Sequence, residues 1–252
     1  TITEDAGIAC ETDMAALRTE HNLALRAARL LAATLPEERR LGVRIELRKG
    51  VPAQGGLGGG SSDAAIVLAT LNALWRAGQD TPALERLAAE LGSDVPFFIR
   101  GGTSLIEGRG ERVTPLPDAA PLWLVLAKPP VNISTPTVFR ALSPAEYHSG
   151  EASAAAVAAI RAGQPVPEAA LVNSLEPGVL RTYPAVAETR EALLAAGAPL
   201  VRMSGSGPTL YAPFAALTSA AAVYERARAT GLRVWLCHTV SAAAVARSRP
   251  DA

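Results

Sequence analysis

The sequence is poor in the residues that build disulfides and metal sites. Its 252 residues include two cysteines, Cys10 and Cys237, which lie far apart in the chain, and three histidines, His21, His148 and His238, which share no metal-ligand spacing. Two lone thiols are typical of a protein from a reducing compartment. We therefore expect no disulfide and no zinc site, and we expect a cytoplasmic location.

Long apolar runs and an excess of charge of one sign are also missing. No run reaches the roughly 18 residues that a membrane span needs, and no signal peptide is expected. The formal net charge is zero, which argues against nucleic acid or an anionic membrane as a partner. With 49% hydrophobic and 19% charged residues, the composition is that of a globular protein with one large domain or two small ones. A phosphate-bearing ligand would therefore have to be held by particular residues or loops rather than by the overall charge of the protein.

The spacing of apolar residues predicts helices that alternate with short strands. Two prolines at 129–130 suggest a boundary between two lobes, 1–128 and 129–252. Short β pieces with glycine turns are expected at 93–116, a strand pair around a glycine-rich turn at 201–214, and a frayed tail after 240. This order predicts the α+β class. Helices are expected at 20–33, 61–78, 82–92, 152–162, 166–180, 184–196 and 217–230, and further strands at 42–50, 121–130 and 233–240.

The run VPAQGGLGGGSSDAA at 51–65 lies between a predicted strand and a predicted helix. Glycine lacks Cβ, so the backbone can adopt positive φ and an anion can approach its N–H groups. Ser61 or Ser62 is placed to cap the helix, whose N-terminus favours negative charge. The run lacks the spacing of a Walker A loop, a dinucleotide fingerprint or a nucleophile elbow. It therefore predicts a phosphate cradle, and a flexible turn without a ligand stays open as the alternative.

Three stretches together resemble the GHMP small-molecule kinases. The first is GLGGGSSDAA, followed by LNALW; the second is GSDVPFF at 92–98; the third is MSGSG at 203–207. The order and spacing of the three stretches agree with the family over nearly the whole chain. The resemblance implies an N-terminal α+β lobe of the ribosomal protein S5 domain 2 type and a ferredoxin-like C-terminal lobe, with ATP and substrate between them.

The resemblance also implies a reaction. The closest pattern in the family belongs to enzymes that transfer the ATP γ-phosphoryl group to the tertiary 2-hydroxyl of a cytidine-diphosphate-linked methylerythritol in non-mevalonate isoprenoid synthesis. A substrate of this kind is a small molecule, and Mg²⁺ is expected with ATP rather than in a protein cage. Other GHMP kinases, such as homoserine or mevalonate-type kinases, and a non-catalytic nucleotide-binding remnant remain as alternatives. The sequence predicts no oligomeric state.

The resemblance assigns roles to residues of the first lobe. Asp94 matches the catalytic aspartate, and the following Val-Pro predicts an extended backbone at this point. Lys49 and Asn22 match nucleotide-contacting positions, with a surface lysine as the alternative for Lys49. Asp63 is either an acid that the helix dipole stabilises or a nucleotide ligand. The residues expected to hold the ATP phosphates are Gly56, Gly58, Gly59, Gly60, Ser61 and Ser62.

In the second lobe the resemblance points to the substrate. Thr135 and Phe139 match positions that line the cytidine pocket, where Phe139 would stack on the base. The alternative for Phe139 is a core residue at a helix start. Gly205, Ser206 and Gly207 would bring backbone N–H groups to the substrate phosphates or stabilise the loop, with a simple hairpin turn as the alternative.

The sequence departs from the family at its first motif. It contains neither the PAK-x-N-L segment, whose lysine pairs with the catalytic aspartate, nor the DGYH segment, which holds the cytosine. We therefore expect these 252 residues to have little or no kinase activity. We also expect the absence of the family's early strands to leave a sheet edge unpaired.

Overall fold

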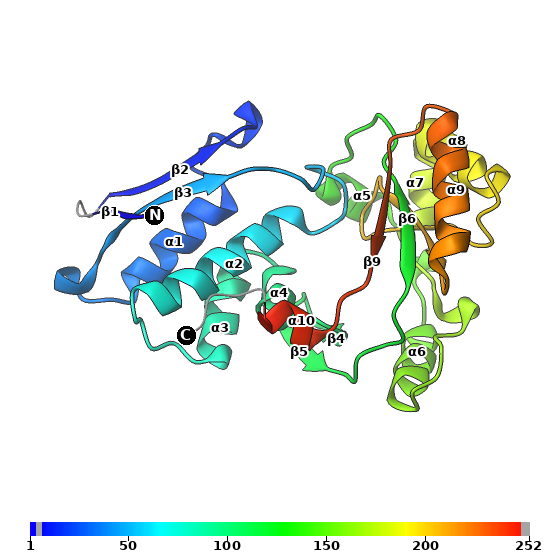
Figure 1. The fold of residues 1–252 in the computed structure, drawn as a ribbon. Helices are drawn as coiled ribbons and strands as arrows, with labels where there is room; N and C mark the ends of the chain where they lie inside the picture. Colours follow the sequence, from blue (N-terminus) through cyan, green and yellow to red (C-terminus); the bar gives the residue numbers. More distant parts are fainter. Residues whose placement is uncertain (4–6, 248–252) are drawn as a thin grey trace. The chain divides into compact units, whose positions relative to one another are not determined.

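The computed structural model describes residues 1–3 and 7–247 (Figure 1). Contacts within the chain divide it into two compact units, which we describe separately. The first unit comprises the described residues of 1–53, 58–116 and 241–247, and the second comprises 54–57 and 117–240. The tip of the glycine run thus belongs to the second unit, whereas its remainder belongs to the first. The lobe boundary expected at residue 128 stays a prediction.

A three-stranded sheet forms one layer of the first unit. Its central strand β3 (Gly42–Leu47) runs antiparallel to β1 (Ile2–Thr3) and parallel to β2 (Ile8–Thr12), with Cys10 opposite Ile45. The predicted alternation along β3 is confirmed, because Val43 is buried and Arg44 is exposed. Any open sheet has two unpaired edges, so the edges of this sheet do not show whether family strands are missing. The expectation of an edge left unpaired by their absence stays a prediction.

Helices cover this sheet and build the core of the first unit. Figure 1 shows α1 and α2 on one side of the sheet. Leu31, Leu68 and Ile99 are fully buried among them, because apolar residues recur at helical spacing along each helix. The elements are η1 (Ala15–Leu17), α1 (Leu23–Ala33), η2 (Glu37–Arg39), α2 (Gly59–Leu74), α3 (Thr81–Leu91), α4 (Val95–Arg100), the hairpin of β4 (Ser104–Glu107) and β5 (Arg112–Pro115), and α10 (Ala242–Arg247).

Three sequence-based predictions fail in the first unit. Helix α2 begins at Gly59, and its N-cap is Gly58, so neither Ser61 nor Ser62 caps it; both lie in its first turn. The backbone at Val95 is helical rather than extended, and 95–100 form a helix where a short β piece was expected, because Pro96 lies in the first turn of α4, where its missing N–H is not needed. Residues 242–247 form α10 against Gly101 and Gly102 instead of fraying, whereas 248–252 lie outside the described residues.

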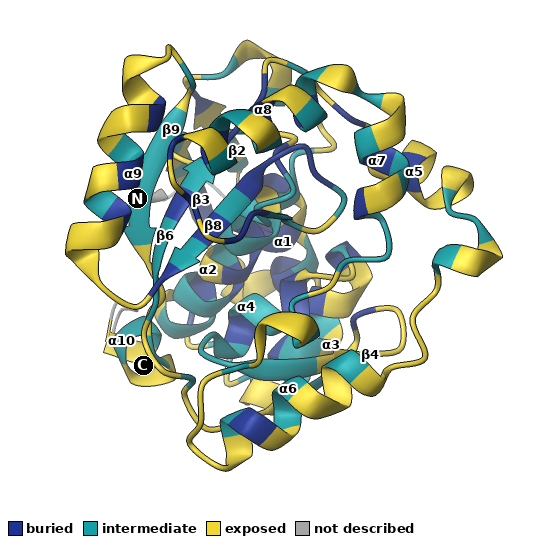
Figure 2. Ribbon diagram, turned by 90° about the vertical axis from the view of Figure 1, so that its right-hand side faces the viewer, coloured by how far each residue is buried: buried dark blue, intermediate teal, exposed yellow. Residues whose placement is uncertain are grey.

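The second unit is built on a four-stranded antiparallel sheet. Its order is β7-β8-β6-β9, and β6 (Trp123–Ala127) pairs with both β8 and β9. Helices α8 and α9 lie together on one face of this sheet in Figure 1, and α9 carries buried residues on one side and exposed residues on the other in Figure 2. The other elements are β7 (Arg202–Met203), β8 (Leu210–Phe214), β9 (Val234–His238), α5 (Thr135–Ala141), η3 (Pro144–Glu146), α6 (Glu151–Arg161), η4 (Glu168–Ala170), α7 (Glu176–Thr182), α8 (Pro184–Ala195) and α9 (Leu217–Ala229).

One helix of the second unit was placed wrongly from the sequence. The range 166–180 contains only the short turn η4 and the start of α7. Pro167 prevents a continuous helix over this range. Pro177 is compatible with a helix only because it lies in the first turn of α7. The strand pair around 201–214 and the helices near 152–162, 184–196 and 217–230 are confirmed.

Helix α2 offers a test of the first core. Leu68 is 0% exposed and Leu74 is 46% exposed on the same helix. We expect Leu68→Ala to lower the free energy of unfolding by about 2–5 kcal/mol, because it leaves a cavity. Leu74→Ala should change it by less than about 0.5 kcal/mol. Urea denaturation followed by circular dichroism measures both, and equal effects would contradict this packing of α2.

Candidate active site

The start of α2 has a glycine as its N-cap and no side-chain cap. Gly58 has a φ of +64°, and a Cβ on it would lie 2.6 Å from the Cζ atom of Phe98, so glycine is required there. Gly58 provides no side-chain cap, and within the described residues the N–H groups of Gly59, Gly60 and Ser61 have no acceptor. Three free N–H groups at the positive end of a 16-residue helix favour an anion.

A partly buried ion pair lies beside this helix start. The ammonium of Lys49 is 2.6 Å from a carboxylate oxygen of Asp63, and the two side chains are 5% and 22% exposed. The ammonium also lies 3.4 Å from the position that a Cβ of Gly59 would occupy. The backbone N–H of Lys49 donates to Asp13 at 3.2 Å. Lys49 is therefore not a surface lysine. Its partner is Asp63, and this pairing was not predicted from the sequence.

Asp94 lies at the N-terminus of α4 and is exposed. Its neighbourhood is held by two contacts. Phe98 of the same helix packs against Gly58, and Gly110 of the β4–β5 turn approaches Ser93 so closely that a Cβ there would lie 2.1 Å from the Ser93 carbonyl oxygen. Among residues 1–3 and 7–247, no cation pairs with the Asp94 carboxylate. Gly110 was not singled out from the sequence. Its φ of +117° is a conformation that side chains rarely adopt, so the structure explains why glycine stands there.

Asn22, the other predicted nucleotide contact, has a structural task. It caps α1, since its side-chain oxygen accepts from Ala24 N at 2.9 Å and its Nδ2 donates to the Leu17 carbonyl at 3.0 Å. Its role toward a nucleotide stays a prediction.

The tip of the glycine run packs against the second glycine-rich turn within the second unit. Ser204 Oγ donates to the Gly56 carbonyl at 2.8 Å, and Thr209 N donates to the Gly55 carbonyl at 3.3 Å. A Cβ on Gly56 would lie 2.3 Å from the Ser204 carbonyl oxygen. The turn between β7 and β8 is therefore more than a simple hairpin, because it also holds this loop tip.

The predicted substrate residues gather around the same turn. Thr135 and Ser206 share a hydrogen bond of 2.8 Å between their hydroxyl groups. They lie beside an open cavity of about 430 Å³, which is lined by Gln54, Gly56, Asn132, Ile133, Ser134, Thr135, Pro136 and Gly207. Phe139 is 58% exposed on α5, which excludes a core role and leaves its ring accessible. Their role toward a substrate stays a prediction.

Two residues that sequence reasoning missed hold this turn in place. Asn173 Nδ2 donates to the carbonyl groups of Met203 at 2.9 Å and Gly205 at 2.8 Å. The buried Glu176 accepts from Met203 N at 2.9 Å. Asn173 and Glu176 stand among apolar residues in the stretch LVNSLEPGVL, and this was the available signal, since buried polar groups need partners.

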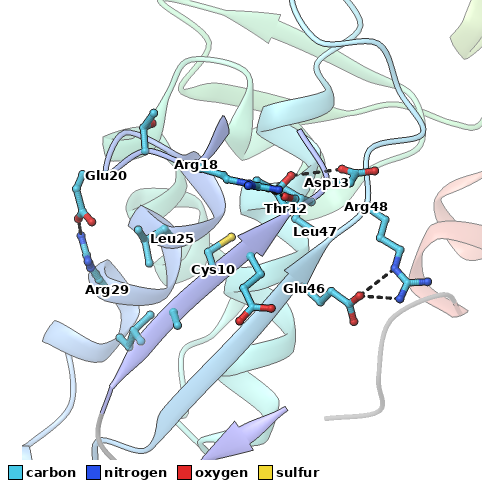
Figure 3. Close-up of a pocket in the computed structure, with 14 residues that line it drawn as sticks. Cys10, Thr12, Asp13, Arg18, Glu20, Leu25, Arg29, Glu46, Leu47 and Arg48 are labelled. Atoms are coloured by element: carbon cyan, nitrogen blue, oxygen red, sulfur yellow. Dashed lines mark hydrogen bonds and ion pairs between the residues drawn. The ribbon is translucent and has the colours of Figure 1, made fainter. Parts of the chain in front are cut away.

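A further cavity of about 1040 Å³ in the first unit contains none of the predicted site residues. Figure 3 shows it between β2, β3 and the N-terminal end of α1, with the ion pairs Glu20–Arg29 and Glu46–Arg48 at its sides. Burial, together with the charge of Asp63, raises the pKa of the Cys10 thiol on β2 above its usual value. Cys10 is therefore protonated at neutral pH and is a poor nucleophile.

The described residues contain no group of three or more histidine, cysteine, aspartate or glutamate side chains that could hold a metal ion. In the same part of the chain, no helix is both long and apolar enough to cross a bilayer.

Gly56→Ala tests the contact between the loop tip and the turn. Gly163, in the same unit, has a similar φ of +66° but nothing within 4 Å of its Cβ position, compared with +69° at Gly56. Gly163→Ala should cost about 1–2 kcal/mol from backbone strain alone. Gly56→Ala should cost clearly more, because its methyl group meets backbone atoms. Equal shifts of the thermal midpoint would show that the contact is absent.

The pair Lys49–Asp63 gives a second test. Asp63→Asn leaves a buried ammonium without its counter-charge, and we expect a loss on the order of 3 kcal/mol in the free energy of unfolding. Adding Lys49→Met should recover part of that loss. Glu46→Gln removes one partner of an exposed pair and should leave the denaturation midpoint unchanged. Additive effects of the Lys49 and Asp63 changes would contradict the pairing.

Comparison with known protein families agrees with the two units. The GHMP kinases N terminal domain matches residues 22–102, and the GHMP kinases C terminal domain matches residues 155–232.

Curated relatives match most of the chain. A protein named 4-diphosphocytidyl-2-C-methyl-D-erythritol kinase from Pelotomaculum thermopropionicum is 44% identical over 221 residues, which cover 87% of this chain and 76% of the relative. One of the same name from Geobacillus kaustophilus is 43% identical over 190 residues, which cover 75% of this chain and 65% of the relative. The chain therefore spans about two thirds to three quarters of the length of these relatives.

Solved structures share the fold. A crystal structure of 4-(cytidine 5'-diphospho)-2C-methyl-D-erythritol kinase superposes with a TM-score of 0.77 at 34% identity and covers 94% of this chain and 84% of that one. A homoserine kinase from Cytophaga hutchinsonii superposes with a TM-score of 0.74 at 19% identity, over 95% of this chain and 84% of that one, which speaks for the fold alone. By sequence and by structure, this chain belongs to the GHMP kinase family.

Proposed function

We propose that the chain transfers the γ-phosphoryl group of ATP to the 2-hydroxyl of 4-diphosphocytidyl-2-C-methyl-D-erythritol, in the cytoplasm. The observation that carries the proposal is the uncapped start of α2, with the Lys49 ammonium beside it and α4, which bears Asp94, packed against it through Phe98. Relatives of that name at 43% and 44% identity favour this substrate over those of other family members.

The proposed chemistry needs positioning and charge stabilisation more than covalent help from the protein. The free N–H groups at Gly59, Gly60 and Ser61 would bind phosphate oxygens, and the Lys49 ammonium, whose charge Asp63 balances, would lie beside them as a further donor. The exposed Asp94 carboxylate would accept the proton of the 2-hydroxyl as its oxygen attacks the γ-phosphorus and the bond to ADP breaks. Thr135, Phe139 and the turn 205–207 would hold the substrate.

Magnesium is proposed as a companion of ATP. Mg²⁺ prefers oxygen ligands and is commonly held by substrate phosphates and one or two protein groups. The start of α2 offers the hydroxyl groups of Ser61 and Ser62 next to the proposed phosphate site, which fits this mode. When bound, the ion would neutralise charge on the phosphates.

A binding and transfer panel tests the substrate. Calorimetry measures the affinity for ATP, and labelled ATP with enzyme in excess measures one round of transfer. We expect transfer to the diphosphocytidyl compound and none to homoserine or mevalonate. Because no cation pairs with Asp94 in the described part of the chain, the rate should lie below the ~1–100 s⁻¹ of ordinary kinases. Transfer to homoserine or mevalonate would assign another activity of the family, and ATP binding without any transfer would indicate a non-catalytic role.

Asp94→Asn tests the proton acceptor. We expect the single-turnover rate to fall about 10²- to 10⁴-fold, because the amide cannot take the proton, with ATP affinity unchanged. Asp80→Asn is the matched control, since Asp80 caps α3 through its side chain and asparagine caps equally well. An unchanged rate in Asp94→Asn would remove Asp94 from the mechanism.

A further inference from the structure

A buried lysine in the second unit is not explained by the proposed roles. Lys128 follows β6 directly and is 7% exposed. Lysine is almost never fully buried unless it is paired. Within residues 1–3 and 7–247 no carboxylate pairs with Lys128; its Nζ donates to two neutral groups, the Val131 carbonyl and Asn132 Oδ1, each at 3.3 Å. Burial, followed by the charge of Arg233, lowers the pKa of Lys128. Keeping this lysine inside the protein is therefore costly and calls for a function.

The lysine determines how the Asn132 amide is oriented. An ammonium group only donates hydrogen bonds, so the amide must present its oxygen to Lys128. The two N–H bonds of Asn132 Nδ2 then remain, and they have no acceptor in the described part of the chain. Asn132 is exposed and lines the 430 Å³ cavity beside Thr135 and Gly207. The free end of the amide is thus a donor that is available to a ligand in this cavity.

The lining of the cavity indicates what that ligand offers. None of its eight lining residues is charged, so no carboxylate repels an anion there. The Lys128 ammonium behind Asn132 adds positive charge and strengthens the donor character of the amide. A ligand group with several negatively charged acceptor oxygens, such as a diphosphate, matches both features.

We propose that Lys128 is a positioning residue that fixes the Asn132 amide with Nδ2 free, and that Nδ2 donates a hydrogen bond to a phosphate oxygen of the diphosphate-bearing substrate. The inference rests on the proposed function, because it assigns this cavity to the diphosphate part of that substrate. Lys128 itself does not touch the ligand and acts through Asn132.

Binding of cytidine 5′-diphosphate and of cytidine, measured by calorimetry on the full chain, tests the proposal. We expect the diphosphate to bind more tightly than the nucleoside. Asn132→Asp replaces the donor by an acceptor of the same shape and should weaken diphosphate binding at least tenfold while leaving cytidine binding unchanged. Lys128→Met should weaken diphosphate binding about fivefold. Arg140→Met, which removes an exposed cation from α5, should change it less than twofold.

A double-variant cycle separates positioning from general damage. In an Asn132→Ala background, Lys128→Met should change diphosphate affinity less than twofold, because the amide through which it acts is gone. Additive losses, equal losses for cytidine, or equal affinity of the wild type for both ligands would overturn the inference. If the cycle behaves as expected but no phosphoryl transfer to the methylerythritol compound occurs, the diphosphate site stands and the proposed function fails. Thermal midpoints of all variants show whether they fold.

Discussion

The backbone conformation of Gly58 is the constraint on which the first unit's candidate site depends. Its positive φ turns the chain from the loop into α2, and the absence of Cβ lets the Phe98 ring pack against it. Because the N-cap is glycine, no side chain occupies the first N–H groups of the helix. The same contact joins α2 to α4, and so it relates the uncapped start of α2 to Asp94. A single glycine therefore leaves the donors free and connects them to the carboxylate.

The glycine-rich run serves the two units in different ways. Residues 58–62 form the helix start in the first unit, whereas 54–57 pack on the turn 203–207 in the second. Asn173 and Glu176 hold that turn through Met203 and Gly205, and Ser204 of the turn itself donates to the Gly56 carbonyl. Each of these contacts joins one side chain to a backbone group. A loop with so much glycine can satisfy both sets of contacts, because its backbone adopts conformations closed to other residues.

Much of the fold and part of the candidate site could be predicted from the sequence. Apolar periodicity located most helices and the strands β3, β6 and β9, and three short motifs led to the family. The errors mostly concern where helices begin, which local residue preferences alone do not decide. Ser61 and Ser62 have good capping propensity, but the helix starts before them, since packing against Phe98 favours Gly58 as the N-cap. Pro96 was expected to impose an extended backbone at Val95, yet it lies in the first turn of α4, where proline is tolerated. The helix expected over 166–180 fails because it would have had to run through Pro167.

By itself the sequence determined the α+β class, the family and the motif residues, because these depend on local patterns of residue type and spacing. Only the tertiary structure decided which partners these residues have. The pairing of Lys49 with Asp63, the support of the turn 203–207 by Asn173 and Glu176, and the burial of Lys128 against Asn132 join residues through side-chain geometry. Hydrogen bonds and ion pairs depend on distances of a few ångströms and on burial. A linear pattern contains neither, so these interactions follow only from the folded chain.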